Sequence, residues 1–132
     1  MLSLVPTPIG NREDITLRAL RYLKELPVFF CEDTRMTIKL MRLYDIDRRN
    51  KQLHSFTSFT SEQKSIQYID IIKEQHCGML SDAGTPGLSD PGKALVKFCR
   101  EYQLPFEVLP GATALIPAVV AGGFDTSSFV YL

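Results

Sequence analysis

The sequence predicts an α/β fold, a three-layer arrangement in which a mostly parallel, five-stranded sheet carries helices on both faces. Short apolar runs alternate with longer stretches in which apolar residues recur at helical spacing, and segments rich in glycine and proline follow most of the apolar runs. Strands that alternate with helices form βαβ units, which require parallel strands. The 132 residues, 45% of them hydrophobic, suffice for one domain with a core.

Five segments are predicted to be strands because they are short, apolar and bounded by turn residues. They are Leu2–Pro6, Val28–Cys31, Lys51–Phe56, Cys77–Leu80 and Phe106–Leu109. The final segment, Ser128–Leu132, is also apolar, and we expect it to begin a sixth strand that continues in a longer protein.

The first two helices are indicated by apolar spacing together with capping residues. From Ile15 to Leu26 the apolar positions recur at helical spacing, and Asp14 is placed to cap this helix. A second helix is expected through Ile38–Leu43, with its cap at Asp33.

The later helices carry their own start signals. Thr60 and Gln63 match the capping-box pattern, and Asp90 followed by Pro91 is typical of a helix start with proline at the first helical position. The segment Ala114–Ala121 is small and apolar, and we expect it to form a helix buried between the layers.

The charge balance identifies no partner by itself. Lysine and arginine together number 15, as do aspartate and glutamate. The two parts of the chain differ mildly, because residues 1–52 hold ten basic and seven acidic side chains whereas residues 53–132 hold five and eight. RNA stays open as a partner, since a nucleic-acid enzyme needs only one basic face.

The sequence predicts a cytoplasmic protein without a membrane partner. Cys31, Cys77 and Cys99 are widely spaced in apolar runs, which indicates buried thiols rather than a disulfide framework or a zinc site. No apolar run approaches the roughly 20 residues of a membrane-spanning helix. The N-terminal stretch MLSLVPTPIG lacks the basic region of a signal peptide.

Functional residues are expected where loops leave the carboxyl ends of parallel strands, because ligands of open α/β sheets bind there. Four such loops are rich in glycine, proline or charge, namely Thr7–Asn11, Glu32–Arg35, Asp82–Asp90 and Pro110–Thr113. Glycine and proline keep a backbone open to a flat or polar ligand, although turn formation alone also explains them.

The third of these loops, within the stretch SDAGTPGLSDPG, does not fit a phosphate site. It lacks the P-loop pattern and the dinucleotide spacing, and its two aspartates would repel phosphate. Carboxylates suit a ligand with positive charge, amino groups or ribose hydroxyls. His54 and His76 are far apart in the sequence and no serine occupies a nucleophile elbow, so we expect neither a hydrolase nor a metal site.

Four stretches, in this order, resemble the N-terminal domain of the ribosomal small-subunit RNA methyltransferase I family: LVPTPIGNREDITLRAL, CEDTR, SDAGTPGLSDPG and LPGATAL. That family belongs to the tetrapyrrole (corrin/porphyrin) methylase superfamily. The resemblance implies the class III methyltransferase fold, with S-adenosylmethionine as cofactor and a homodimer as the assembly. It also implies that residues 1–132 are the N-terminal domain of a two-domain methyltransferase whose C-terminal domain is absent from this chain.

The implied reaction is methylation of the ribose 2′-hydroxyl of a cytidine in 16S ribosomal RNA, so this RNA or the small ribosomal subunit is the expected partner. The basic loops and the SDAGTPG form favour the RNA branch over the corrin branch. Two alternatives stay open. One is a corrin or porphyrin C-methyltransferase, and the other is a noncatalytic module for cofactor binding or dimerisation.

The resemblance also implies which residues contact the cofactor. Carried over by motif, they are Pro8, Asp82, Ala83, Gly84, Thr113 and Ala114, with Ser89 and Asp90 as adjacent candidates. The carboxylates among them would accept hydrogen bonds from a cationic ligand.

Catalysis and RNA binding are expected on the first two loops. Methyl transfer from a sulfonium is an in-line displacement that needs no metal, and Glu32, Asp33 and Arg35 are candidates for the base or for a phosphate contact. Another reading of the same residues is that Asp33 caps a helix and Glu32 pairs with Arg35. Asn11 and Arg12 are expected to hold RNA, helped by cations of the first part of the chain such as Arg18, Lys39, Arg42, Arg48 and Arg49.

Overall fold

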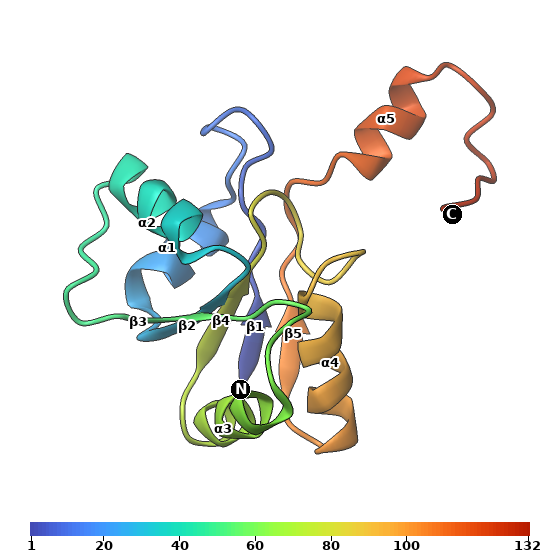
Figure 1. Cartoon of the computed structure of the whole chain (residues 1–132). Helices are drawn as coiled ribbons and strands as arrows, with labels where there is room; N and C mark the ends of the chain where they lie inside the picture. Colours follow the sequence, from blue (N-terminus) through green and yellow to red (C-terminus); the bar gives the residue numbers. More distant parts are fainter.

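A parallel sheet of five strands organises the chain in a computed structural model that describes all residues, 1–132 (Figure 1). The strands lie in the order β3-β2-β4-β1-β5. They are β1 (Leu2–Leu4), β2 (Val28–Cys31), β3 (Gln52–Ser55), β4 (Cys77–Leu80) and β5 (Phe106–Val108). The helices are α1 (Leu17–Glu25), α2 (Thr34–Leu43), α3 (Glu62–Glu74), α4 (Gly92–Glu101) and α5 (Leu115–Ala121).

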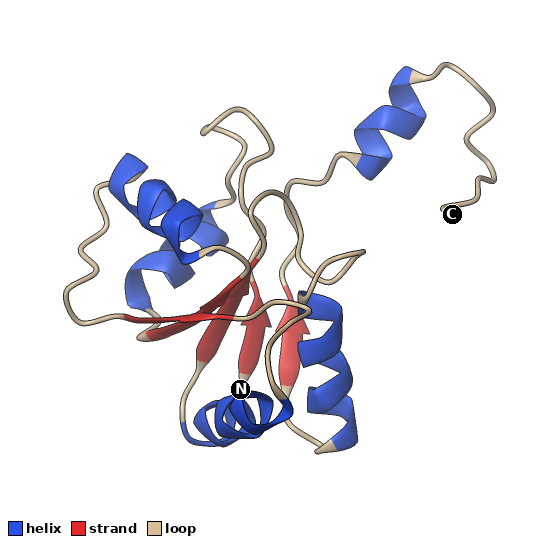
Figure 2. Cartoon of the chain, viewed as in Figure 1, coloured by secondary structure: helices blue, strands red, loops and turns tan.

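Four helices cover the two faces of the sheet, which confirms the three-layer prediction (Figure 2). On one face α1 and α2 bury a cluster that includes Ala19, Leu23, Phe29, Met41 and Leu80. On the other face α3 and α4 bury a cluster that includes Phe30, Ile72, Met79, Leu95 and Cys99. Adjacent residues of a strand point to opposite faces, so Phe29 and Phe30 each anchor a different layer.

The direction of the connections creates a crevice above β4. The chain that leaves β1 or β2 passes to the face covered by α1 and α2, whereas the chain that leaves β4 passes to the face covered by α4. Loops that diverge to opposite faces leave an opening at the carboxyl ends of neighbouring strands, which is where open α/β sheets bind ligands. The loops after β1, β2 and β4 therefore frame the candidate site.

Two predicted helix caps were wrong by one or two residues. The side chain of Thr16, not Asp14, accepts from the amide of Ala19 at the start of α1. Ser61, not Thr60, caps α3 by accepting from the amide of Lys64. Asp33 caps α2 as predicted.

The C-terminal part differs from expectation. Helix α5 forms, but none of its residues is buried, so the prediction of a helix buried between layers was wrong. Figure 1 shows α5 extending away from the sheet, and its apolar residues are at most half-buried. Residues Ser128–Leu132 form no strand, because a strand requires a hydrogen-bonded neighbour and this segment has none.

The three cysteines are free thiols buried in the core, as predicted. Burial raises the pKa of Cys31 and Cys77 to about 11, so both remain protonated at neutral pH. No helix is long and apolar enough to cross a membrane.

A polar cluster lies under α1, at the end of the sheet opposite the candidate site. The Ser3 hydroxyl donates to Glu107 at 2.7 Å and lies 2.6 Å from Nε2 of His76. Glu107 also accepts from the hydroxyl of Tyr22 at 2.9 Å and from Arg18 at 2.8 Å. This cluster joins β1, β5 and α1, and its groups satisfy one another.

The cluster makes stability depend on pH. Burial alone would raise the pKa of Glu107, but hydrogen bonds from Ser3 and Tyr22 and the charges of Arg18 and His76 lower it overall. Burial, followed by the nearby N-terminal ammonium, lowers the pKa of His76 against the opposing effect of Glu107. Both folded-state pKa values lie below the unfolded ones, so the unfolded chain takes up protons first as the pH falls.

We expect the free energy of unfolding to fall as the pH drops below about 6.5, where unfolded histidine protonates, and again below about 4.3, where unfolded glutamate does. The Glu107→Gln variant should be less stable than the parent at pH 7, and this difference should shrink as the pH falls through the folded-state pKa of Glu107. Urea unfolding of the parent and the variant at a series of pH values measures this difference in stability. Glu25→Gln on the exposed face of α1 is the control. A difference that stays constant from neutral to acid pH would contradict the assignment.

Candidate active site

Two backbone hydrogen bonds clamp the loop after β1 to the loop after β4. The amide of Thr7 donates to the carbonyl of Gly84 and the amide of Gly84 donates to the carbonyl of Thr7, both at 3.0 Å. Gly84 has φ +79°, and a Cβ there would meet the side chain of Ile9 at 3.3 Å. Glycine is therefore favoured at this position by its conformation, and a larger residue would also displace the side chain of Ile9.

The loop after β4 is also tied to itself and to the loop after β5. The Ser81 hydroxyl donates to the carbonyl of Ala83 at 3.0 Å, and the Thr85 hydroxyl donates to the carbonyl of Ala112 at 3.0 Å. A Cβ on Gly111 would overlap the ring of Pro6, so the loop after β5 also packs against the chain leaving β1. These contacts bring together the three loops that carry the predicted cofactor residues.

Asp90 fixes the end of the loop after β4. Its carboxylate accepts from the amide of Gly87 at 2.9 and 3.0 Å and from the amide of Gly92 at 2.8 Å. The neighbouring Ser89 has φ +58°, and its hydroxyl lies 2.8 Å from that of Tyr131. The carboxylate of Asp90 thus holds the loop in shape ahead of α4, which begins at Gly92, one residue after the predicted start at Pro91.

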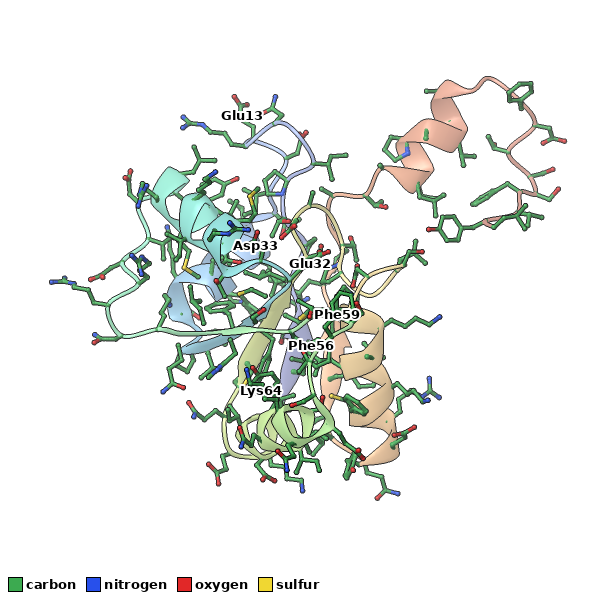
Figure 3. The ribbon with its side chains drawn as sticks, viewed as in Figure 1. Glu13, Glu32, Asp33, Phe56, Phe59 and Lys64 are labelled. Atoms are coloured by element: carbon green, nitrogen blue, oxygen red, sulfur yellow. The ribbon has the colours of Figure 1, made fainter.

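Asp82 and Glu32 lie together at the ends of the neighbouring strands β4 and β2, and Figure 3 shows Glu32 and Asp33 at this end of the sheet. The amide of Asp82 donates to Oε2 of Glu32 at 3.2 Å. The carboxylate of Asp82 is exposed and accepts no hydrogen bond from a side chain. Burial and then the charge of Asp33 raise its pKa. The site therefore presents an exposed carboxylate without a side-chain partner to a ligand.

Of the three predicted catalytic residues, Asp33 and Arg35 are paired with each other. The guanidinium of Arg35 donates to both carboxylate oxygens of Asp33, at 3.1 and 2.9 Å. These hydrogen bonds lower the pKa of Asp33. The expected pair between Glu32 and Arg35 was wrong, because the guanidinium reaches the carboxylate two residues away. Glu32 keeps one oxygen without a partner in the chain.

Two hollows flank the pair formed by Glu32 and Asp82. The smaller, of about 620 Å³, lies between the loop after β1 and α2 and includes Pro8, Asn11, Arg12 and Asp82 in its lining. The larger, of about 1190 Å³, lies between residues 57–59 and α4 and includes Glu32, Ser89 and Asp90. The smaller hollow has the size of a small-molecule site.

Only some of the predicted residues line these two hollows. Ala83, Gly84, Thr113 and Ala114 line neither of them and lie on the clamped loops. The side chain of Asn11 accepts from the amide of Glu13 at 2.9 Å and so stabilises its own turn. Arg12 is exposed.

Sequence reasoning missed the residues that line the larger hollow along α4. They are Lys93, Lys97 and Arg100 on α4, together with Phe59 on the facing turn. The spacing of the three cations by four and three residues in a predicted helix was the available signal, because residues at this spacing share one helix face.

Comparison with known proteins assigns the family. Residues 1–130 match the protein family described as "Tetrapyrrole (Corrin/Porphyrin) Methylases". This chain belongs to that family. Among solved structures, uroporphyrin-III C-methyltransferase from Thermus thermophilus aligns over 96% of this chain and 53% of its own, at 25% identity and a TM-score of 0.63. A cobalt precorrin-4 methyltransferase aligns over 92% of this chain and 50% of its own, at 16% identity and a TM-score of 0.65, a likeness of fold alone.

Relatives with higher identity carry another name. The protein called ribosomal RNA small subunit methyltransferase I from Hydrogenobaculum sp. (strain Y04AAS1) is 43% identical to this chain. The alignment covers 99% of this chain and 56% of that relative. The one from Thermotoga maritima is 40% identical, covering 98% and 58%. The resemblance seen in four motifs is confirmed over the whole chain. The chain spans about half the length of these relatives.

The role of Asp90 leads to a stability prediction. Asp90→Ala should lower the free energy of unfolding by about 1–3 kcal/mol, because the amides of Gly87 and Gly92 lose their acceptor. Asp90→Asn keeps one acceptor oxygen, so its free energy of unfolding should lie between those of the parent and of Asp90→Ala. Chemical denaturation measures the effect, with exposed Asp70→Ala as a control expected within about 0.5 kcal/mol of the parent. An Asp90→Ala variant as stable as this control would show that the loop does not depend on the carboxylate.

Proposed function

We propose that this chain is the N-terminal domain of an S-adenosylmethionine-dependent methyltransferase that methylates the ribose 2′-hydroxyl of a cytidine in 16S ribosomal RNA. The observation that carries the proposal is the similarity of about 40% identity along the whole chain to relatives named for methylation of small-subunit ribosomal RNA. Membership of a methylase family and the free carboxylates at the strand ends agree with it.

The site fits the cofactor by charge and by shape. S-adenosylmethionine carries a sulfonium and an ammonium group, and an exposed carboxylate at Asp82 is a suitable partner for either. The smaller hollow beside Pro8 and Asp82, of about 620 Å³, has the size of a small-molecule site, and the buried clamp at Gly84 holds its loops in place. The proposed cofactor contacts are Pro8, Asp82, Ala83, Gly84, Thr113 and Ala114, with Ser89 and Asp90 at their edge.

Glu32 is the proposed base among the three catalytic candidates. The cofactor, when bound, supplies an electrophilic methyl group. Because Asp33 and Arg35 are already paired with each other, Glu32 is the carboxylate with an unpartnered oxygen beside Asp82. Its role is to accept the proton of the attacking 2′-hydroxyl, while Arg35 and the first-loop residues Asn11 and Arg12 are proposed to face the RNA backbone.

The assembly is proposed to be a cytoplasmic homodimer of two-domain subunits. The length of the relatives supports the second domain, since the chain spans about half of them. Corrin and porphyrin methylation is the second candidate, because the structural neighbours carry those names.

Loss of Asp82 should weaken cofactor binding. In the full-length protein, Asp82→Asn is expected to raise the dissociation constant for S-adenosylmethionine at least about tenfold, as the loss of one charge-assisted hydrogen bond of about 1.5–3 kcal/mol implies. Calorimetric titration measures it, with Asp70→Asn on the exposed face of α3 as control. Equal binding by both variants would remove Asp82 from the site.

The substrate is tested by transfer of a labelled methyl group. We expect label on 16S RNA of small subunits that lack the modification, recovered after nuclease digestion as 2′-O-methylcytidine, and none on uroporphyrinogen III. Glu32→Gln should reduce turnover by about 10²- to 10⁴-fold, the range of general base catalysis, with cofactor affinity retained. Label on the tetrapyrrole alone would replace the RNA function by the second candidate.

A further inference from the structure

The larger hollow extends beyond the residues needed for methyl transfer. It has a volume of about 1190 Å³ and runs between the turn of residues 57–60 and the exposed face of α4. One end is at Glu32, and the other lies along α4 as far as Arg100 and Glu101. We call it the α4 groove, defined by Glu32, Phe59, Lys93, Lys97 and Arg100.

The side chain of Phe59 lines the α4 groove and is exposed to solvent. Phe59 is 94% exposed, and Figure 3 shows it near the beginning of α4. The turn that carries it is well ordered by hydrogen bonds. The amide of Phe59 donates to the hydroxyl of Thr57 at 3.2 Å, and the amide of Thr57 donates to the hydroxyl of Thr60 at 2.8 Å. A structured turn thus holds a large apolar ring in water.

Three cations follow one face of α4 beside this ring. Lys93, Lys97 and Arg100 are all exposed, and they cover about 10 Å along the helix axis. Lys93 and Arg100 form no ion pair, and Lys97 lies 3.8 Å from Glu101 in an exposed pair that contributes little. Their charge is therefore available to a ligand.

The acidic groups of the groove do not cancel this charge. The carboxylate of Asp90 accepts from the amides of Gly87 and Gly92, and Glu32 accepts from the amide of Asp82. Both lie at the end of the groove next to the candidate active site, whereas the cations continue along α4. A third acid, Glu101, lies at the far end beside Lys97. The helix therefore lines the groove with three cations and one carboxylate, an excess of positive charge away from the reacting end.

An aromatic platform beside a row of cations is the arrangement that binds single-stranded nucleic acid, because bases stack on the ring while phosphates meet the cations. We propose that the α4 groove binds the single-stranded segment of the RNA substrate next to the target nucleotide, with a base on Phe59 and phosphates on Lys93, Lys97 and Arg100. This inference rests on the proposed RNA function. It gives the strand a path that ends at Glu32.

The test uses the full-length protein and unmodified small ribosomal subunits. Phe59→Ala is expected to raise KM for the subunit about 5- to 100-fold, the range of one lost base stack, whereas Phe59→Trp should keep it near the parent value. The triple variant Lys93→Gln, Lys97→Gln, Arg100→Gln should raise KM further. It should also reduce the slope of log binding constant against log salt concentration by about 2.

Three readouts separate RNA binding from a structural role. The kcat at saturating subunit, the dissociation constant for S-adenosylmethionine and the melting temperature should stay at parent values in every variant. Lys24→Gln on α1 and Lys73→Gln on α3 are matched charge controls that should leave KM and the salt slope unchanged.

The outcomes distinguish the two proposals. If the parent protein methylates no RNA, the proposed function fails and this inference with it. If the parent methylates RNA but the α4-groove variants match the controls in KM and salt slope, the inference alone fails. If the variants lose cofactor binding or thermal stability together with the rise in KM, the inference also fails. The groove residues would then affect KM by supporting the fold and not by contacting RNA.

Discussion

The clamp between Thr7 and Gly84 is the constraint on which the site depends. It joins the chain leaving β1 to the chain leaving β4 at the point where one passes to the face of α1 and the other to the face of α4. Without it, the two loops would diverge and the strand ends would open to water. Because both backbone groups of each residue are used, the clamp fixes the loops without calling on any side chain.

Most backbone amides and carbonyls around this clamp already have hydrogen-bond partners within the chain. The polar groups without such partners are the ones that a ligand can bind. Asp90 accepts from two amides of its loop, and Ser81 and Thr85 satisfy carbonyls of the clamped loops. The polar side-chain atoms left over at the strand ends include carboxylate oxygens of Asp82 and Glu32 and the buried hydroxyl of Thr7. A site of this kind has a negative field at its centre, which favours a cationic ligand and disfavours phosphate there.

Much of this arrangement was predictable from the sequence, for physical reasons that also explain the errors. Buried strands such as Val28–Cys31 stand out because they must be apolar on both faces. Helix caps were missed where several polar residues lie close together in the sequence, as with Asp14 and Thr16. The sequence does not tell which of these side chains reaches a free amide in the first turn of the helix. The pairing of Asp33 with Arg35 was missed for the same reason. The burial of Ala114–Ala121 was overestimated, because an apolar helix is buried only where a partner covers it.

The distribution of charge in the fold also differs from what the composition alone suggests. The excess of basic residues in the first part of the chain lies partly in local pairs, as Arg49 with Asp47 and Arg21 with Glu25 show. Residues 53–132 have an excess of acid, but Asp90 and Glu107 are bound within the fold. On α4, Lys93 and Arg100 form no ion pair, and both line a groove that includes Glu32. A neutral chain can thus carry acidic groups at its strand ends and a row of cations along a neighbouring helix, because pairing in the fold, rather than the count of charges, sets the field that a ligand meets.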